Sequence, residues 1–336
     1  MSPTDVTGLP ALHPGGAVSF IIPARAAASI IADCLVRVMA QLREQDEVIV
    51  AAADTLTAAA VQMHGERDAR VHVVANPAGT TPAALNAALA VARNPIIIRV
   101  DAQSRIPDGY RDRVVELLAS TGAVNVGGRQ IAQGTRGTAA AIAVAMNARL
   151  GHGGAAYRSG ATGGPVDTVY LGAFRADALR LVGGYDERFL TNQDAELNER
   201  LRRAGGIVWL DPALEVGYLP RTTLRALSRQ FRAYGRGRAM TARRHRGSLG
   251  PRQLAAPTLV VGLLVALGAL PWTVVPLVVW AGGYGSLLVL GTLLEGADAA
   301  RRFPRVVAAL AVMHLSWGYG FLTASRRAPH RENAAG

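Results

Sequence analysis

Residues 96–101 read Ile96-Ile97-Ile98-Arg99-Val100-Asp101, an apolar, β-branched run that stops on an acid. Such a run is typical of a buried strand in a sheet that is covered on both faces. Because open α/β sheets bind their ligands beyond the carboxyl ends of the strands, we expect Asp101 to face solvent and substrate. This stretch therefore predicts an α/β domain with a carboxylate at its functional edge.

The chain before this run repeats a strand and helix alternation. Apolar runs at 18–22, 47–51 and 71–75 alternate with helical spacing over 26–42 and with Thr81-Pro82, which fits a helix start. The alternation predicts a Rossmann-like, mostly parallel sheet with helices on both faces. Pro23-Ala24-Arg25 follows the first strand in place of Gly-x-Gly-x-x-Gly, which disfavours a dinucleotide site.

After Asp101 the pattern loosens. We predict helices over 107–118, 175–182 and 193–204, strands near 124–127, 166–171 and 208–210, and a mobile Gly-rich loop from 151 to 164. The helix at 193–204 opens with Asn192-Gln193-Asp194, so a second acid lies at the start of an element. Asp194 fits a carboxylate that caps free backbone N–H groups, and it also fits, together with Asp101, a metal-and-base site.

The C-terminal part of the chain is unusually apolar. The protein has 336 residues, 50% of them hydrophobic, and a mean hydropathy of +0.20, which is high for a wholly soluble protein. No charged residue occurs between Arg252 and Glu295, a stretch long enough for two membrane spans, and a third apolar run covers 306–324. We therefore expect two or three membrane helices within 253–325, with Pro271-Trp272 as a hairpin turn.

Basic residues gather just before this apolar region. The net charge is +12, all 36 basic residues are Arg, and no acid interrupts the stretch from Arg221 to Arg252. Such a segment follows the positive-inside pattern and attracts anionic headgroups. Between Leu224 and Arg238 the arginines form a stripe opposite an apolar face, which fits a solvated surface helix, an interfacial helix or a helix that closes over a phosphorylated ligand. No finger or helix-turn-helix supports nucleic-acid binding.

The sequence suggests a division into five parts. Residues 1–16 lack the features of a signal peptide and are interpreted as a flexible polar leader. The α/β domain covers 17–220, the Arg-rich amphipathic segment 221–252, the membrane region 253–325 and a basic tail 326–336. The lone Cys34 excludes a disulfide within one chain and a cysteine metal site.

Several short motifs, in this order and spacing, resemble the family 2 inverting glycosyltransferases of the GT-A fold. Among these the chain is most similar to the membrane-associated succinoglycan glucosyltransferase type, over roughly residues 18–238. The motifs that carry the resemblance are Pro23-Ala24-Arg25, Asn76-Pro77, Thr80-Thr81-Pro82-Ala83-Ala84-Leu85-Asn86, Arg99-Val100-Asp101-Ala102-Gln103, Val182-Gly183-Gly184-Tyr185-Asp186-Glu187, Asn192-Gln193-Asp194-Ala195-Glu196-Leu197 and Arg229-Gln230-Phe231-Arg232.

The resemblance implies roles for individual residues. Asp194 matches the family's catalytic base, and Asp101 with Gln103 matches the motif that holds Mg²⁺ or Mn²⁺ against the diphosphate of a sugar donor. The nucleotide-sugar-binding residues would be Pro23, Arg25, Asp54, Asn86 and Asp101. The diphosphate or acceptor would be bound by Gln193, Arg229, Arg232 and Arg236.

Three positions depart from the family pattern. Gln103 replaces a second carboxylate, so that position brings no charge to the metal. After the second strand, where the family has an acid that contacts the nucleobase, the chain offers only Asp54. The family's Gln followed three residues later by Arg becomes Gln230 and Ala233, with the arginine at Arg232.

The resemblance implies a metal-dependent hexosyltransferase at the plasma membrane, with its catalytic domain in the cytoplasm. It would move a hexose from a nucleotide sugar, a UDP-sugar in our interpretation, to a lipid-linked or polysaccharide acceptor, with membrane lipids and no nucleic acid as partners. A non-catalytic GT-A-like membrane scaffold is the alternative. The altered nucleobase and second-metal positions favour it, whereas the intact Asp101 and Asp194 disfavour it. A nucleotidyltransferase is disfavoured, because the Gly-rich phosphate loop after the first strand is missing.

Overall fold

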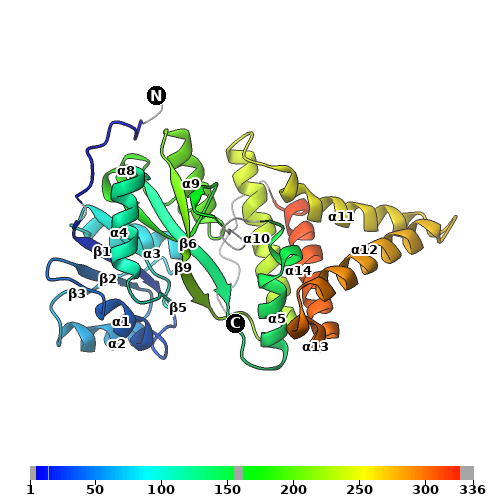
Figure 1. The fold of residues 1–336 in the computed structure, drawn as a ribbon, viewed down its shortest axis with the longest axis horizontal. Helices are drawn as coiled ribbons and strands as arrows, with labels where there is room; N and C mark the ends of the chain where they lie inside the picture. Colours follow the sequence, from blue (N-terminus) through cyan, green and yellow to red (C-terminus); the bar gives the residue numbers. More distant parts are fainter. Residues whose placement is uncertain (1–4, 14, 155–161, 326–336) are drawn as a thin grey trace. The chain divides into compact units, whose positions relative to one another are not determined.

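The computed structural model describes residues 5–13, 15–154 and 162–325 of the chain. The chain divides into two compact units, the first formed by residues 1–131 and 156–218 and the second by residues 132–155 and 219–336. Figure 1 shows the elements of each unit. Residues 132–155 thus lie in the second unit, whereas the sequence analysis assigns them to the α/β domain.

The first unit alternates strands and helices as far as β4 and then changes character. Its elements are β1 (Val18–Ala24), α1 (Ile31–Met39), β2 (Glu47–Ala52), α2 (Thr55–Gly65), β3 (Val71–Ala75), α3 (Thr81–Val91), β4 (Ile96–Arg99), β5 (Ser104–Arg105), α4 (Tyr110–Thr121), β6 (Asn125–Ala132, whose last residue belongs to the second unit), β7 (Gly164–Pro165), β8 (Tyr170–Arg175), α8 (Ala176–Leu181), α9 (Gln193–Arg203) and β9 (Val208–Tyr218).

The strands in the described residues form one sheet in the order β3-β2-β1-β4-β8-β6-β9-β5, with β7 beside β9. β3, β2, β1 and β4 pair in parallel, as the sequence predicts. The predicted α/β class is confirmed, but beyond β4 the sheet is mixed and not mostly parallel, because β8 is antiparallel to both β4 and β6, and β5 and β7 are antiparallel to β9. Antiparallel partners need no helical crossover, so the regular alternation that signals parallel strands is lost there.

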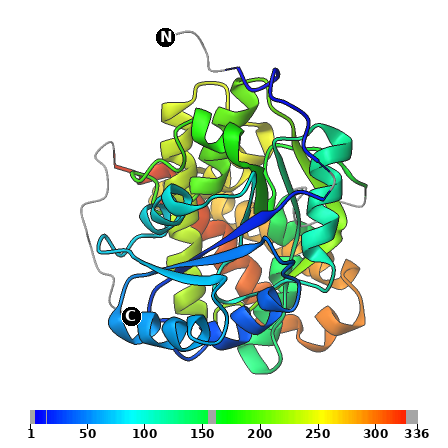
Figure 2. The ribbon, with the colours of Figure 1, turned by 90° about the vertical axis from the view of Figure 1, so that its left-hand side faces the viewer.

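Helices cover both faces of this sheet. One core joins alternate residues of β1 and β2, such as Phe20 and Val48, to α1, α2 and α4. The other joins Ile21 and Ile49 to α3, α8 and α9. Figure 2 gives a second view of these layers. Because both faces are buried, the carboxyl ends of the parallel strands are where substrates can reach the sheet.

The described part of the leader, residues 5–13 and 15–16, differs from the sequence-based expectation of a flexible segment. Val6 is 3% exposed, and its backbone N–H donates to the carbonyl of Ala204 at 2.9 Å. Leu9 and Leu12 pack against the two cores of the first unit. The apolar side chains spaced along this segment explain the difference, since burying them favours a docked segment over a free one.

The second unit is helical. Its described residues form α5 (Gly137–Asn147), α6 (Arg149–His152), α10 (Leu224–Arg244), α11 (Pro251–Gly268), α12 (Val275–Leu294), α13 (Ala297–Arg301) and α14 (Phe303–Leu322). Three of them, α11, α12 and α14, are long and apolar enough to cross a membrane. α11 and α12 are joined at 269–274, the predicted hairpin turn, where Trp272 is 83% exposed.

Helices α10 and α14 pack closely along one another. A side chain on Gly235 would meet the backbone of Trp317, and one on Gly320 would meet the backbone of Arg232, so glycine permits this approach at both positions. Leu227 and Phe231 are buried on α10, whereas Arg225 is exposed. The predicted amphipathic character of this helix is confirmed.

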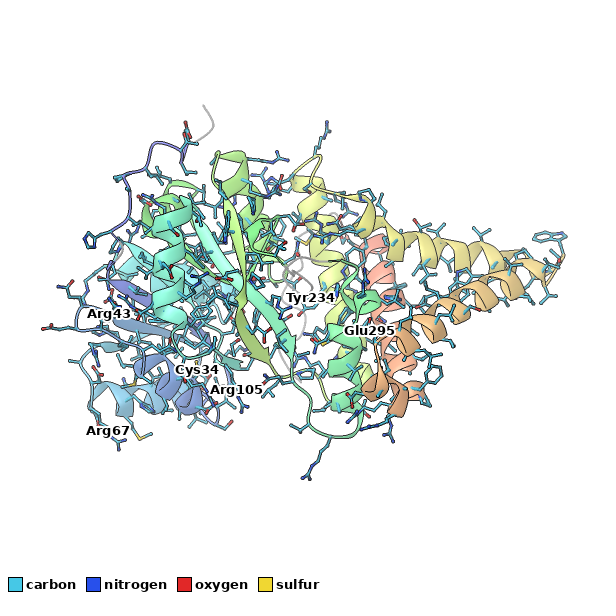
Figure 3. The ribbon with its side chains drawn as sticks, viewed as in Figure 1. Cys34, Arg43, Arg67, Arg105, Tyr234 and Glu295 are labelled. Carbon is cyan, nitrogen blue, oxygen red and sulfur yellow. The ribbon has the colours of Figure 1, made fainter. Side chains whose placement is uncertain are left out.

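Two polar contacts tie the short helices of the second unit to the long ones. Glu295, which follows α12, accepts a hydrogen bond from the backbone N–H of Arg149 at 2.7 Å, and Figure 3 labels this side chain. The Nε2 atom of His314 on α14 lies 2.9 Å from the carbonyl oxygen of Leu150. Half of the predicted mobile loop at 151–164, residues 155–161, lies outside the described part of the chain, and residues 151–152 belong to α6.

Candidate active site

Asp101 follows β4 at the carboxyl edge of the parallel strands. Ile96, Ile97 and Ile98 are fully buried between the helical layers, and this packing fixes the strand. The chain then leaves the sheet through Val100, whose N–H donates to the carbonyl of Ile21 at 3.0 Å. The Asp101 side chain retains 18% exposure. It therefore has the access to solvent that the sequence predicts for it.

Asp194 lies in the first turn of α9. The preceding Asn192 has a φ of 65°, and this left-handed residue turns the chain into the helix. Leu197 and Leu201 are fully buried in the core and anchor the helix. The Asp194 side chain is 37% exposed. Its neighbour Gln193, which is predicted to bind the diphosphate or acceptor, is buried, with 9% of its surface exposed.

One guanidinium joins the two acids. The Nε of Arg99 donates to Oδ1 of Asp101 at 2.9 Å, and its Nη1 donates to Oδ1 of Asp194. Arg99 itself is only 4% exposed. Among the described residues, the hydrogen-bond partner of Asp194 is this side chain and not a backbone N–H of the helix start, which disfavours the capping role considered above. Two acids from separate elements thus converge at one place.

The surroundings of Asp194 alter its acidity. Although its side chain is 37% exposed, the protein around the Asp194 carboxyl displaces part of its water, and this desolvation disfavours the charged form and raises its pKa above the usual value. The Arg99 guanidinium opposes that rise, and the negative charge of Asp101 adds to it. A carboxylate whose pKa lies above the usual value is a stronger proton acceptor, as a general base requires.

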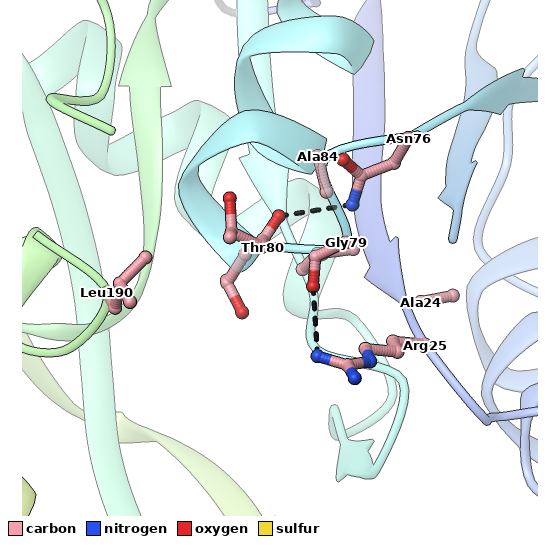
Figure 4. Close-up of a pocket in the computed structure, with 9 residues that line it drawn as sticks. Ala24, Arg25, Asn76, Gly79, Thr80, Ala84 and Leu190 are labelled. Carbon is pink, nitrogen blue, oxygen red and sulfur yellow. Dashed lines mark hydrogen bonds between the residues drawn. The ribbon is translucent and has the colours of Figure 1, made fainter. Parts of the chain in front are cut away.

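A pocket of about 230 Å³ opens beside the end of β1. It is lined by Pro23, Ala24, Arg25, Asn76, Gly79, Thr80, Thr81, Ala84 and Leu190. Figure 4 shows Arg25 donating to the carbonyl of Gly79 at 3.2 Å and the amide of Asn76 donating to the carbonyl of Thr80 at 3.1 Å. Two predicted nucleotide-sugar residues, Pro23 and Arg25, therefore line one cavity. Leu190 comes from the segment just before α9.

Asp54 has a structural task next to this pocket. Its carboxylate accepts from the N–H of Thr57 at 2.9 Å, which caps α2, and from the N–H of Ala26 at 2.7 Å. These two backbone N–H groups lower the pKa of Asp54. The second bond holds Ala26 at a φ of 48°, in the turn that follows β1. Asp54 thus shapes the loop that carries Arg25, and its role toward a nucleotide stays a prediction.

Asn86 uses its side-chain amide within the protein. It accepts from the N–H of Tyr185 at 2.8 Å and donates to the carbonyl of Tyr185 at 2.8 Å and to Glu187 at 3.0 Å. The described residues that line the pocket do not include Asn86. Its geometry fixes the loop before α9, and nucleotide binding by Asn86 stays a prediction.

The residues near Asp101 fit a cation that is shared with a substrate. Within residues 5–13, 15–154 and 162–325, no three His, Cys, Asp or Glu side chains gather closely enough to hold a metal ion. Gln103 is exposed two residues after Asp101. Mg²⁺ is commonly held by one or two carboxylates together with substrate phosphates and waters. The protein therefore fits an ion that arrives with a diphosphate and not a site built from protein ligands alone.

The predicted phosphate-binding arginines lie in the second unit. Arg229, Arg232 and Arg236 are all exposed on α10. The guanidinium of Arg232 stacks over the ring of Tyr319 at 4.9 Å, and the amide of Gln230 donates to the hydroxyl of Tyr234 at 2.8 Å. Their predicted role toward the diphosphate or acceptor stays open.

Sequence reasoning missed the role of Arg99, although the motif that it belongs to was recognised. The guanidinium carbon of Arg99 lies 6.0 Å from the centre of the Tyr185 ring, and only 2% of the Tyr185 surface is exposed. The signal was available, because an arginine that interrupts a buried apolar strand needs anionic partners.

Comparison with known proteins places these observations in context. Residues 19–180 match the family model described as glycosyl transferase family 2. The chain is 39% identical over 263 residues to the succinoglycan biosynthesis protein ExoA of Rhizobium meliloti, covering 76% of this chain and 77% of that protein. It is 32% identical over 94 residues to a pre-mycofactocin glycosyltransferase of Mycobacterium tuberculosis, covering 28% of this chain and 20% of that protein.

Solved structures support the same fold. The mannosyltransferase PcManGT from Pyrobaculum calidifontis, in complex with GDP-Man and Mn²⁺, aligns with a TM-score of 0.58 and 17% identity over 94% of this chain and 91% of its own. GalNAc-T7 with UDP, GalNAc and Mn²⁺ aligns with a TM-score of 0.51 and 12% identity over 73% of this chain and 51% of its own. At these identities the likeness concerns the fold.

Proposed function

The chain belongs to glycosyltransferase family 2, and we propose that it moves a hexose from a nucleotide sugar to a lipid-linked or polysaccharide acceptor with inversion. We take a UDP-sugar as the donor. The observation that carries this proposal is the convergence of Asp101 and Asp194 on the Arg99 guanidinium. One acid can serve the donor while the other serves the acceptor, as a single displacement requires.

Asp194 acts as the base. It accepts the proton of the acceptor hydroxyl as that oxygen attacks the anomeric carbon, and the bond to the nucleoside diphosphate breaks on the opposite face. The attack inverts the configuration, and no covalent intermediate with the protein forms. The partial exposure of Asp194 supports this role, since a hydroxyl from outside can reach its carboxylate.

Asp101 and Gln103 would hold the divalent cation. When bound, Mg²⁺ or Mn²⁺ neutralises the charge that develops on the departing diphosphate. Asp101 has a carboxylate oxygen available for a cation, because only Oδ1 of its two carboxylate oxygens accepts a hydrogen bond from another described residue. Two enzymes of similar fold have been solved with Mn²⁺, which supports a metal of this class.

The pocket beside β1 would hold the nucleotide. Pro23 and Arg25 lie at the end of β1, on the same edge of the sheet as Asp101, and Thr80 and Thr81 offer hydroxyl groups. An arginine provides donors for phosphate or for a base edge. Pocket and acids together fit a ligand with a nucleotide at one end and a sugar at the other.

We further propose that the product belongs to an exopolysaccharide of the cell envelope. The similar protein ExoA is named for succinoglycan biosynthesis and is matched over most of both chains. A catalytic domain at the bilayer suits an acceptor that is anchored there, because confinement raises the effective concentration of the acceptor.

The membrane region fits a hairpin with an interfacial partner. α11 and α12 expose apolar side chains such as Leu264 and Leu290, each 60% exposed, and would span the bilayer as a pair. α14 lies along α10, whose exposed arginines would cost about 2.5–3.5 kcal/mol each at the bilayer centre. We infer that α10 and α14 lie at the surface, with the catalytic domain in the cytoplasm on the side of the basic residues.

A screen of nucleotide sugars tests the proposal. Purified full-length protein in detergent is incubated with Mn²⁺ and each candidate donor, and mass spectrometry detects release of nucleoside diphosphate or transfer to a glycan. We expect turnover of one UDP-sugar. No turnover of any donor, together with no metal-dependent heat on titration with UDP, would favour the scaffold alternative.

A further inference from the structure

Arg99 occupies an unusual position for an arginine. It ends β4 directly after three isoleucines that have no exposed surface, and its own exposure is 4%. Removing a guanidinium from water costs several kcal/mol unless opposite charges and hydrogen bonds compensate. The compensation comes from Asp101 and Asp194, the two acids that the proposed reaction uses.

Arg99 is itself held in place. Its guanidinium carbon lies 6.0 Å from the centre of the Tyr185 ring. That ring is buried and meets Phe174 edge to face, with 6.4 Å between the ring centres. The backbone N–H and carbonyl of Tyr185 are both bonded to Asn86 at 2.8 Å. The position of the guanidinium is therefore set by the protein core and not by the two acids alone.

We propose that Arg99 is a positioning residue, which fixes the carboxylate of Asp194 at a set place relative to Asp101. The inference rests on the proposed function and adds a part to it. A base aligns with the acceptor hydroxyl only if its carboxylate stays in one orientation. Donor and acceptor react only if the two acids that serve them keep a fixed position relative to one another. A guanidinium suits this task, because its planar fork presents separate N–H groups to two acceptors.

The charges of the cluster support this role. Asp101 and Asp194 are two like charges near one another, and Gln103 adds none. A cation that bonds to both carboxylates offsets part of their mutual repulsion. Lysine would keep the charge but offers a compact ammonium without the fork, so it cannot reproduce both bonds in the same geometry.

The test compares Arg99→Lys with a matched control. Arg105, labelled in Figure 3, lies nearby on β5, is 47% exposed and pairs with Asp33 at 3.6 Å, so Arg105→Lys makes the same change away from the two acids. We expect Arg99→Lys to lower kcat by about 100-fold, since a misplacement of about 1 Å can cost that much. The KM for the donor and the Kd for UDP with Mn²⁺, measured by calorimetry, should stay unchanged, and Arg105→Lys should match the wild type.

A second variant separates positioning from folding. Arg99→Ala removes the group, and added guanidinium ion at millimolar concentration should restore part of kcat in this variant and none in Asp194→Asn. Thermal unfolding of each variant gives its folded fraction. Lower kcat at unchanged Kd, with rescue in Arg99→Ala alone, supports the inference.

Three results would overturn it. They are a wild-type kcat in Arg99→Lys, a loss of UDP affinity as large as the loss of kcat/KM, and a loss of activity fully explained by the unfolded fraction. If the wild type turns over no donor, the proposed function is wrong, and this inference, which depends on it, is wrong as well. If the wild type is active and Arg99→Lys equals it, the inference alone fails.

Discussion

Asp101 and Asp194, which lie on separate elements of the first unit, accept hydrogen bonds from the same guanidinium, that of Arg99. Asp101 is supplied by the end of a parallel strand and Asp194 by the first turn of a helix. This arrangement brings the acid proposed to serve the donor and the acid proposed to serve the acceptor to one place. The predictions below follow from it and from the helices of the second unit.

Removal of the metal should stop turnover. EDTA is expected to abolish release of nucleoside diphosphate, and Mn²⁺ or Mg²⁺ in excess should restore it, because Asp101 and Gln103 alone give the diphosphate no compensating charge. Asp101→Asn should lose most of the heat of UDP binding that depends on Mn²⁺. Full activity in chelator would contradict the metal assignment.

The acid limb of the pH profile should lie above the usual aspartate range. Burial raises the pKa of Asp194, so the base becomes protonated, and inactive, at a higher pH than an ordinary Asp with a pKa of about 3.9. The measurement is kcat/KM between pH 3 and 8, which reports groups of the free enzyme. A limb at or below the usual value would show that another group limits the rate.

The exposed arginines of α10 are expected to contribute to binding of the donor or the acceptor. Arg229→Ala and Arg236→Ala are each expected to raise the KM for the acceptor or donor by about tenfold, because a hydrogen bond to a charged group contributes about 1.5–3 kcal/mol. Arg67→Ala, an exposed position in the first unit that Figure 3 labels, is the control. Unchanged KM values for both substrates would remove these residues from the site.

The topology predicts opposite labelling at two positions. Trp272→Cys in the hairpin turn should react with an impermeant maleimide added to intact cells, and Ser325→Cys, just after α14, should react only after the cells are opened. The native Cys34 should not interfere, because it is buried and burial raises the pKa of its thiol to about 12. Labelling of Ser325→Cys from outside would favour three full spans over the hairpin.

The parallel half of the sheet could be predicted because each of its strands is a mostly apolar run. Ile96–Arg99 and Glu47–Ala52 are buried throughout, and helical spacing separates such runs. The antiparallel half could not be predicted in the same way. β5 and β7 are two residues long, and their pairing with β9 comes from distant parts of the chain. Two residues are too few to show the alternation of apolar and polar residues by which a strand is recognised in a sequence.

Site residues could be predicted where a sequence motif identifies them. They could not be predicted where their role depends on tertiary contacts. Asp101 and Asp194 follow from the order of motifs, and the structure brings them together. Asn86 belongs to a recognised motif, yet its amide is bonded to Tyr185, a residue far along the chain. The link through Arg99 depends in the same way on which side chains the fold places around a buried charge. The docking of Val6 against Ala204 is another such contact.

The most direct test is the transfer reaction of Asp194→Asn beside the wild type, with Asp33→Asn, an exposed carboxylate at 56%, as the matched control. Transfer is followed by mass spectrometry, and NMR gives the anomeric configuration of the product. The account predicts an inverted product from the wild type and Asp33→Asn, and a kcat lower by about 10²–10⁴-fold in Asp194→Asn with UDP affinity retained. Undiminished transfer by Asp194→Asn, or a product of retained configuration, would contradict it.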